Sequence, residues 1–392
     1  MSAAIPPSVS AIVAAARAAL PVDRAEMALH EPEFRGAEWT YVKECLDTNW
    51  VSSVGSYVDR FEAQLRDCTG IATATATVNG TAALHMALLL SGVQHGDEVL
   101  TPTLTFVATA NAVCHAGATP HFVDCEPRTL GVDAARLDHH LRDTAELHGS
   151  GCRNRRSGAP IRALMAMHVF GHPCEIEALA EVCARWQLTL IEDAAESLGS
   201  FYRGRHTGHV GYVAALSFNG NKIVTTGGGG AVLSNDIELG RRAKHLTTTA
   251  RVPHPWLFLH DEVGYNYRLP NLNAALGCAQ MERLPDFLER KRRLAGRYAD
   301  AFRDVGGVSV LHEPPQARSN YWLNTLLLDQ PDLALRDAAL VGLNDAGIRA
   351  RPAWTLMHKL PMYSVCPRMP LPVAELLEAR IINLPSSASL GS

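Results

Sequence analysis

The sequence predicts an α/β protein, with a mainly parallel sheet between helices in a large domain and a smaller α+β domain at the C-terminus. From about residue 72, short runs of β-forming residues alternate with helical patterns, which is typical of parallel sheets covered on both faces. After residue 304 the pattern changes to strand, helix and strand. A chain of 392 residues, of which 47% are hydrophobic, can build one large core and one smaller core.

Seven stretches have the character of strands, so we expect a seven-stranded sheet. They lie at residues 74–78, 98–101, 119–123, 161–168, 188–193, 213–218 and 231–234. Helices are expected to begin at residues 81 and 105 and to cover residues 175–186. Residues 144–160 are rich in Gly, Ser and Arg, which predicts a surface loop.

The two ends of the chain have patterns of their own. Residues 1–30 are rich in alanine and helical in pattern, and we interpret them as a lead-in. A long helical stretch begins near residue 271, is expected to break at Pro285, and continues to about residue 304. We expect strands at 321–328 and 348–352, with a helix at 333–346 between them. The predicted division is a lead-in (1–30), a large domain (31–290) and a small C-terminal domain (291–392).

Composition argues against several classes of partner. The 36 basic and 40 acidic residues give a net charge of −4, so the chain lacks the positive charge that attracts nucleic acid or anionic membranes. No apolar stretch reaches the roughly 18–20 residues of a membrane helix, and no basic lead-in of a secretory signal is present. Nine cysteines without a C-x-x-C pair indicate reduced thiols in the cytoplasm. The 17 histidines show no metal-ligand spacing, so we expect no metal site.

One segment presents a lysine where a strand is expected to end. Residues 217–222 read Ser-Phe-Asn-Gly-Asn-Lys, and four glycines follow at 227–230. Such a turn lets the backbone bend sharply or approach a ligand closely. Lys222 therefore suits a nucleophilic lysine, whose amine must lie where burial or nearby charge favours its neutral form. Taken alone, a single lysine is more often a solvated surface residue.

Three further segments have residues that could bind a ligand or take part in catalysis, each near the end of an expected strand. Asp193 follows the strand at 188–193 and could keep a pyridine nitrogen protonated, or it could cap the next turn. Gly80 and Thr81 begin a helix, where free N–H groups favour a phosphate, although many helix starts bind nothing. Phe106 could stack on a flat ring or pack in the core. A phosphate cradle, a stacking ring, an acid and a lysine are together the parts of a pyridoxal phosphate (PLP) site.

In combination these segments resemble the DegT/DnrJ/EryC1/StrS family of sugar aminotransferases, within the fold-type I enzymes that use PLP. Similar blocks extend from about residue 31 to residue 384 and include residues 79–81, 192–195, 217–222 and 264–275. More narrowly, residues 29–32, 45–55, 196–200 and 217–222 resemble the LegC-like branch. That branch makes 4-amino sugars for bacillosamine and legionaminic acid, in cell-surface polysaccharide biosynthesis.

The resemblance implies a role for each matching residue. Lys222 would form the internal aldimine, and Asp193 would pair with the pyridine nitrogen. Glu196 stands where many family members have Gln near the phenolic oxygen of PLP, which puts the hydrogen bonding there in doubt. Ser217 would bind the phosphate with the backbone of Gly80 and Thr81, and Phe106 would stack on the ring. Asn266 would reach the phosphate of the neighbouring subunit's cofactor, which implies a homodimer with shared active sites.

The resemblance also implies a reaction. L-Glutamate would donate an amino group by ping-pong transamination to a nucleotide-linked 4-keto-6-deoxy sugar, for which the branch suggests UDP-2-acetamido-2,6-dideoxy-hexos-4-ulose, aminated at C4. Polar and aromatic residues in segments that could meet this substrate are His168, Arg251, His254, Trp256, Arg351, Trp354 and His358.

Other functions remain as alternatives. The sugar could be a GDP-linked 4-keto or a TDP-linked 3-keto sugar, because no spacing identifies the base or the carbon. The chain could also be a non-catalytic regulatory relative, which would have no need for Lys222. A related sugar dehydratase would have His at position 222. A Rossmann-type dehydrogenase is disfavoured, because no G-x-G-x-x-G lies between a strand and a helix.

Overall fold

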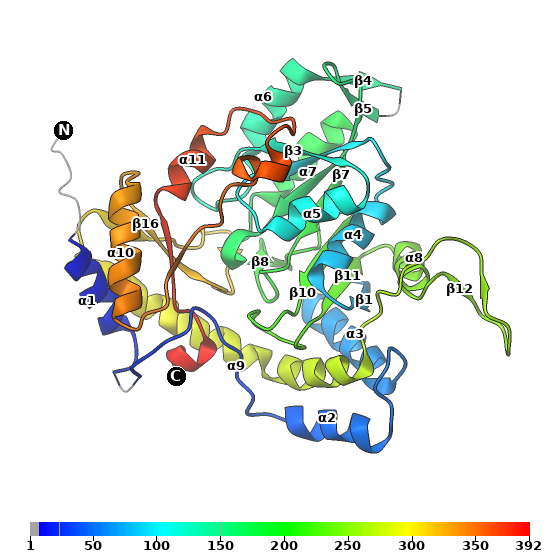
Figure 1. The fold of residues 1–392 in the computed structure, drawn as a ribbon, viewed down its shortest axis with the longest axis horizontal. Helices are drawn as coiled ribbons and strands as arrows, with labels where there is room; N and C mark the ends of the chain where they lie inside the picture. Colours follow the sequence, from blue (N-terminus) through cyan, green and yellow to red (C-terminus); the bar gives the residue numbers. More distant parts are fainter. Residues whose placement is uncertain (1–7, 23, 150) are drawn as a thin grey trace.

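A nine-stranded sheet forms the centre of the molecule in the computed structural model, which describes residues 8–22, 24–149 and 151–392 (Figure 1). Seven strands follow one another across it, in the order β1, β11, β10, β7, β6, β2 and β3. Neighbours from β10 to β3 are parallel, whereas β11 runs antiparallel to both β1 and β10. In chain order the seven strands are β1 (Thr73–Thr77), β2 (Glu98–Pro102), β3 (Thr119–Val123), β6 (Pro160–Met167), β7 (Thr189–Asp193), β10 (Val213–Ser217) and β11 (Gly230–Ser234).

Helices cover both faces of this sheet because successive strand residues point to opposite faces. In β10, Val213 and Ala215 pack in one apolar cluster with α4 (Gly80–Leu90), α5 (Val107–His115) and α8 (Ile237–Thr247). Ala214 and Leu216 pack in another cluster with α3 (Ser56–Thr69) and α9 (Asn271–Phe302). On that second face, α6 (Ala134–Thr144) and α7 (Ile176–Trp186) cover the half of the sheet around β3. The predicted seven strands and the layered α/β fold are confirmed.

The segment 144–160 differs from the expected surface loop. It contains two short strands, β4 (Ala145–His148) and β5 (Gly151–Asn154), which pair with each other, while β5 also pairs with β6. Ala145, Cys152 and Asn154 are buried within this otherwise polar hairpin. The Gly, Ser and Arg content concealed the short ladder, so the loop prediction was wrong; residue 150 lies outside the described residues.

The expected break at Pro285 was also wrong. Helix α9 runs without interruption from Asn271 to Phe302 and includes Pro285 in its interior. Proline removes one helical hydrogen bond, but buried side chains on both sides of it, including Leu284 and Phe287, hold the helix against the core. Figure 1 shows α9 extending along the molecule from α2 (Glu38–Asp47) to α1 (Val9–Ala19). The proposed domain boundary at 290/291 falls inside this helix and remains a prediction.

A second, antiparallel sheet follows α9, and two of its four strands lie in the stretches expected at 321–328 and 348–352. Its strand order is β14 (Val308–Val310), β16 (Asn324–Leu328), β18 (Ile381–Leu384) and β17 (Arg351–Pro352). Helix α10 (Leu333–Asp345) and α1 pack with this sheet and α9 in one apolar cluster. The helical lead-in therefore contacts the C-terminal part, and its residues 1–7 and 23 lie outside the described residues. No described helix is long and apolar enough to cross a membrane.

Candidate active site

The chain contains five lysines, and their environments differ. Lys43, Lys244 and Lys359 are at the surface and pair with carboxylates. Lys291 is fully buried and donates hydrogen bonds from Nζ to the carbonyls of Trp322 and Ser386. Lys222 alone lines a cavity of about 300 Å³ at the carboxyl ends of the parallel strands. The other residues lining it include Asn79, Gly80, Thr81, Phe106, Thr109, Asp193, Ala195, Glu196, Ser217, Asn221, Trp322 and Trp354.

One end of this cavity is suited to an anion. Asn79 caps α4 through a 2.8 Å hydrogen bond from the N–H of Ala82 to its side chain. The first N–H groups of α4, at Gly80 and Thr81, lack helical acceptors and carry the positive end of the helix dipole. A Cβ atom on Gly80 would lie 2.7 Å from the Ser217 Cβ, so glycine lets the helix start approach the end of β10 closely. Together, the helix start and the Ser217 hydroxyl provide donors for a phosphate.

Asp193 lies at the end of β7, in the interior of the cavity. The residue is 2% exposed, and its carboxylate accepts hydrogen bonds from the Thr109 hydroxyl at 2.8 Å and from the Ala195 N–H at 3.2 Å. The second bond caps the turn after β7, so the simpler capping interpretation also holds. Burial raises the pKa of Asp193, while its hydrogen-bond donors and Lys222 oppose that rise. A cationic N–H partner would stabilise this buried carboxylate further.

Glu196 lies beside Lys222, and their side chains form a 3.2 Å contact between Oε1 and Nζ. The other carboxylate oxygen accepts a 2.9 Å hydrogen bond from the N–H of Phe170. Burial raises the pKa of Glu196 to about 7, against the opposing effect of Lys222. A carboxyl with such a pKa can hold or release a proton near neutral pH.

Phe106 is at the mouth of the cavity, and the core-packing alternative for it is wrong. It immediately precedes α5 and is 48% exposed. Its ring lies 6.3 Å from that of Trp354, which packs in turn against Phe170 with 4.9 Å between ring centroids. The rings of Phe106 and Trp354 line one part of the cavity, where a flat ligand could stack.

Most of the suggested sugar-binding residues lie elsewhere. Among them, only Trp354 lines the cavity. His168 is fully buried and contacts Glu192 at 2.9 Å, and His358 is held by Thr103 at 2.8 Å, so both are structural. Asn266 is exposed and does not line the cavity of its own chain. The remaining four, outside the cavity, are Arg251, His254, Trp256 and Arg351.

Sequence reasoning missed two residues that complete the site. Thr109 orients Asp193 and lies in the helix that was expected to begin at residue 105, but nothing in the sequence identified Asp193 as its partner. Trp322 lies just before β16, and its ring centroid is 4.0 Å from the Lys222 Nζ. No motif signals this contact, because 100 residues separate the two side chains.

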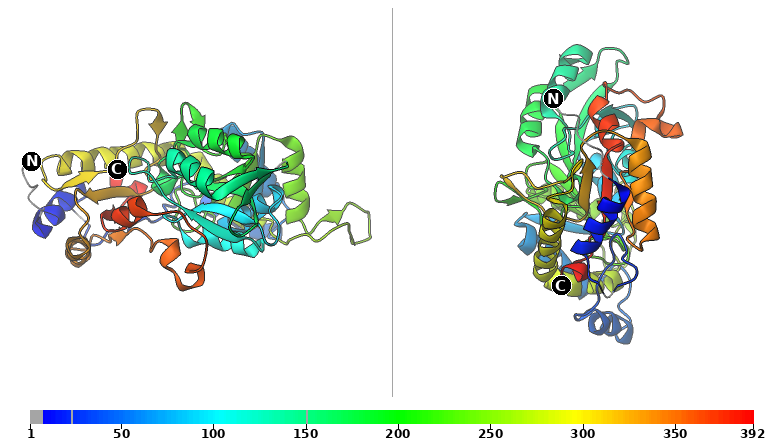
Figure 2. Two further views of the ribbon diagram at one scale, coloured as in Figure 1. Left: turned by 90° about the horizontal axis from the view of Figure 1, so that it is seen from above. Right: turned by 90° about the vertical axis from the view of Figure 1, so that its left-hand side faces the viewer.

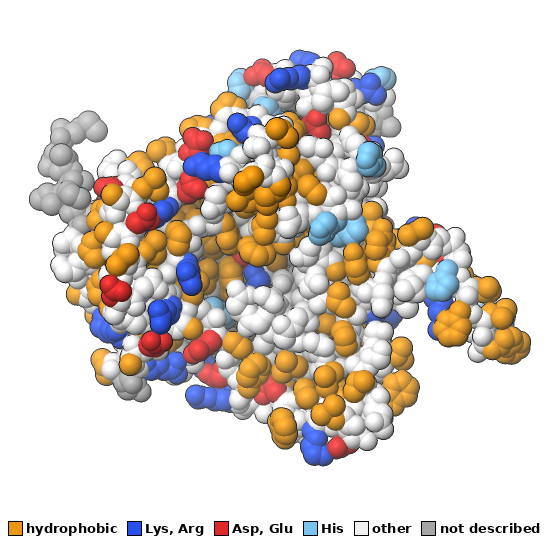
Figure 3. Space-filling model, viewed as in Figure 1, with side chains coloured by type: hydrophobic (Ala, Val, Ile, Leu, Met, Phe, Trp, Pro, Cys, Tyr) orange, Lys and Arg blue, Asp and Glu red, His pale blue; other side chains and the backbone are white. Residues whose placement is uncertain are grey.

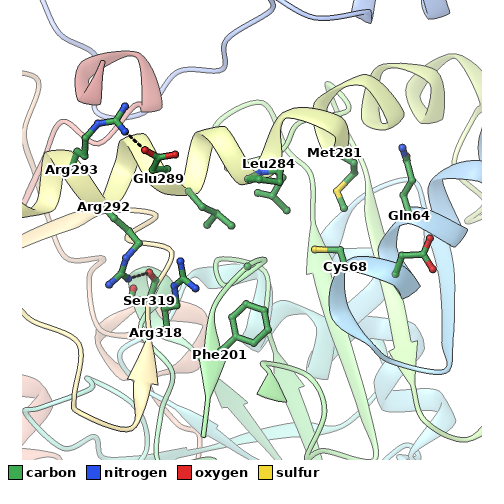
Figure 4. Close-up of a pocket in the computed structure, with 14 residues that line it drawn as sticks. Gln64, Cys68, Phe201, Met281, Leu284, Glu289, Arg292, Arg293, Arg318 and Ser319 are labelled. Carbon is green, nitrogen blue, oxygen red and sulfur yellow. Dashed lines mark hydrogen bonds and ion pairs between the residues drawn. The ribbon is translucent and has the colours of Figure 1, made fainter. Parts of the chain in front are cut away.

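A larger cavity, of about 870 Å³, lies between α3, α9 and residues 199–201 (Figure 4). Figure 4 shows Met281 and Leu284 on α9 near Cys68 and Phe201, with Arg292 and Arg318 near one end. None of the predicted site residues lines it. One possible metal-ligand group exists among the described residues, His245, Asp261 and Glu262, but it is largely exposed and Arg242 already binds Glu262.

The smaller cavity meets the requirements of PLP. Phosphate donors lie at the start of α4 and at Ser217, the acid for a ring nitrogen is Asp193, the aromatic wall includes Phe106, and Lys222 supplies an amine. Seven of the eight predicted site residues line this one cavity, and Asn266 is the exception.

Comparisons with known proteins agree. The sequence pattern of the DegT/DnrJ/EryC1/StrS aminotransferase family matches residues 32–392. GDP-perosamine synthase from Caulobacter vibrioides is 37% identical, with 94% of this chain and 95% of that protein covered. The putative pyridoxal phosphate-dependent aminotransferase EpsN from Bacillus subtilis is 37% identical, with 86% of this chain and 83% of that protein covered. The crystal structure of the aminotransferase TlmJ from Streptoalloteichus hindustanus superposes with a TM-score of 0.83, 28% identity, and 93% and 94% coverage.

Proposed function

Because this chain belongs to the DegT/DnrJ/EryC1/StrS aminotransferase family, we propose that it transfers the amino group of L-glutamate to C4 of a nucleotide-linked 4-keto-6-deoxy sugar. It is a PLP-dependent sugar aminotransferase that acts on nucleotide sugars. The observation that carries the assignment is that Lys222, Asp193 and the start of α4 line one cavity. Membership and cavity together favour catalysis over the regulatory alternative.

The residues of the cavity would hold the cofactor at three places. Gly80, Thr81 and Ser217 would bind its phosphate, Asp193 its ring nitrogen, and Phe106 one face of its ring. Bound PLP supplies an aldehyde for the amine of the substrate and an electron-withdrawing ring. Glu196, at the usual Gln position, would face the phenolic oxygen. Thr109 donates a 2.8 Å hydrogen bond to the Asp193 carboxylate and would keep it in place for the ring nitrogen.

Lys222 would carry the proton in both halves of the reaction. Its Nζ can accept a proton from the amino-acid carbon and later return one to the sugar carbon. Glu196 lies 3.2 Å from that Nζ and has a pKa near 7, so it can balance the charge of the lysine as the lysine gains and loses the proton. Both side chains are largely buried, with 11% of Lys222 and 1% of Glu196 exposed, which limits exchange of this proton with solvent.

For the nucleotide, the GDP-perosamine synthases favour GDP, because their product is a GDP-linked 4-amino sugar. The LegC-like blocks at residues 29–32 and 196–200 favour the UDP-linked 2-acetamido sugar as second candidate. We place the reaction in the cytoplasm, an inference supported by nine free cysteines, six of them buried, which are typical of a reducing compartment.

A substrate panel tests this proposal. The purified holoenzyme is incubated with L-glutamate and a GDP-, UDP- or TDP-linked 4-keto-6-deoxy sugar, and the products are identified by mass spectrometry and NMR. We expect 2-oxoglutarate and a 4-amino sugar, with the GDP substrate giving the highest kcat/KM. Amination at C3, or no amination with any nucleotide sugar, would contradict the proposal.

We further propose a homodimer in which Asn266 reaches the partner's cofactor. An arm formed by β12 (Arg251–Val252) and β13 (Leu259–His260) projects from the body of the molecule (Figures 1 and 2). Its tip exposes hydrophobic side chains (Figure 3), among them Trp256 at 76% and Phe258 at 75%. Exposing such a hydrophobic surface to water is unfavourable in an isolated chain, whereas a partner subunit would bury it. Asn266 lies at the base of this arm, where it pairs with Thr248.

Removing both aromatic side chains should weaken the dimer. Replacing Trp256 and Phe258 with serine should raise its dissociation constant roughly 100-fold or more, since buried aromatic anchors dominate interfaces. Light scattering at decreasing concentration measures this change, and activity should fall with the dimer fraction. Val365→Ser, at an exposed position far from the arm in sequence, is the control. A monomeric wild type with full activity would contradict the shared site.

A further inference from the structure

An indole ring lies directly against the amine that carries the proposed chemistry. The Nζ of Lys222 is 4.0 Å from the centroid of Trp322, within the range of a favourable cation–π contact. Lys222 comes from the turn after β10, and Trp322 comes from the segment before β16 of the C-terminal sheet. The two parts of the chain therefore meet at this amine.

Hydrogen bonds fix the indole in place. Its Nε1–H donates to the carbonyl of Asn221 at 2.8 Å, so the ring also holds the residue before Lys222. The Trp322 N–H donates to the Asn320 side chain at 2.7 Å, and its carbonyl accepts from Lys291 at 3.2 Å. Trp322 is 5% exposed, so its ring has little freedom to turn.

The same network also holds the backbone of Glu196, whose carboxylate contacts the amine. The Asn320 side chain donates to the carbonyls of Glu196 and Leu198, each at 2.9 Å. Glu196 Oε1 lies 3.2 Å from the Lys222 Nζ. Asn320 thus links the backbones of Trp322 and Glu196, whose side chains both contact the amine.

Few other charges act on this amine. Asp193 and Glu196 are the carboxylates that face it. Burial lowers the pKa of Lys291 well below its usual value, so the lysine behind Trp322 is held towards its neutral form. Burial, as the main cause, likewise lowers the pKa of His30, whose ring lies 6.4 Å from that of Trp322. Attraction by the indole and by the two carboxylates therefore dominates.

We infer that Trp322 is a positioning residue that holds the released amine of Lys222 between the two halves of the transfer reaction. The inference rests on the proposed function. A lysine side chain has four rotatable bonds, and an unrestrained amine would lose the alignment that proton transfer requires. The indole face attracts the ammonium form without covalent or strongly directional bonding, and so the amine stays beside Glu196 yet remains free to leave. Replacing Trp322 with phenylalanine would keep an aromatic face but remove the hydrogen bond to the Asn221 carbonyl. Replacing it with leucine would remove both.

Lysine-selective NMR tests the contact without turnover. The full-length protein is labelled with ¹³Cε-lysine and loaded with pyridoxamine 5′-phosphate. This form of the cofactor carries an amine in place of the aldehyde and so cannot bind covalently to Lys222. Five lysines give a simple spectrum, and Lys222→Arg assigns the resonance of interest. We expect its ε-protons to be shifted upfield by the indole ring current, with the shift lost in Trp322→Leu and partly kept in Trp322→Phe. Trp354→Leu removes another indole from the same cavity and should leave this shift in place.

Kinetics test the role of the contact. Losing a cation–π contact should lower kcat by about 2- to 30-fold in Trp322→Leu, with less loss in Trp322→Phe and little change in the KM for L-glutamate. The pH profile of kcat should also change in Trp322→Leu. Thermal unfolding should show that both variants are folded, and a merely structural role would then leave the pH profile unchanged. An unshifted Lys222 resonance in the wild type, or an unchanged kcat and pH profile in Trp322→Leu, would overturn the inference while an active wild type upholds the proposed function. A shifted resonance in an inactive wild type would instead refute the proposed function, and with it the role given to Trp322.

Discussion

Lys222→Ala should abolish transamination while leaving the fold intact. The side chain is the one lysine amine in the cavity, and no other lysine of the chain can replace it, because Lys291 is buried behind Trp322 and the remaining three are at the surface. Losing both the nucleophile and the proton carrier should reduce kcat by at least about 10⁴-fold. Product formation by mass spectrometry measures the loss.

Two observations separate this effect from unfolding. The variant should keep the circular dichroism of the wild type and should still bind the cofactor through Gly80, Ser217 and Asp193, but borohydride should no longer fix the cofactor to the protein. Lys244→Ala, at a surface position on α8, is the matched control and should retain full activity. Transamination by Lys222→Ala above about 1% of the wild-type rate would require another residue in this role.

The sequence allowed much of the site to be predicted, because its parts lie at strand ends. Asp193 and Ser217 each end a recognisable strand, and Gly80 begins the helix that follows another. The carboxyl ends of parallel strands lie at one edge of a sheet. Local sequence patterns therefore predicted that these residues come together at one edge of the sheet. Phe106 was placed by the same rule, since it also follows a strand end.

The contributions of Thr109, Trp322 and Asn320 could not be read from the sequence, since they depend on packing between distant segments. Trp322 reaches Lys222 only because the C-terminal sheet docks beside the loop after β10. The same limit explains the sugar-binding candidates. From the sequence alone, His168 and His358 could bind a substrate. In the fold both are buried, and their rings contact Glu192 and Thr103 respectively.

Asp193→Asn should lower kcat by about 10²–10⁴-fold, which is the second largest effect expected. The carboxylate is buried, and its charge would hold the ring nitrogen protonated. Removing one member of a buried ion pair costs about 3–5 kcal/mol, and each 1.36 kcal/mol corresponds to a factor of ten in rate. Asparagine fits the same space and can keep the Thr109 and Ala195 contacts, so it changes the charge with little change in shape.

Thr109→Val provides the matched comparison, because it removes the 2.8 Å hydrogen bond to Asp193 while leaving the charge. Its kcat should fall by about 10- to 150-fold, as expected for one hydrogen bond to a charged group. Stopped-flow measurement of the L-glutamate half-reaction should locate both losses at the proton-transfer step, and a slower reaction in deuterated glutamate would identify that step. If Asp193→Asn were no slower than Thr109→Val, orientation rather than charge would be the contribution of this residue, and the partner of the ring nitrogen would have to be sought elsewhere in the cavity.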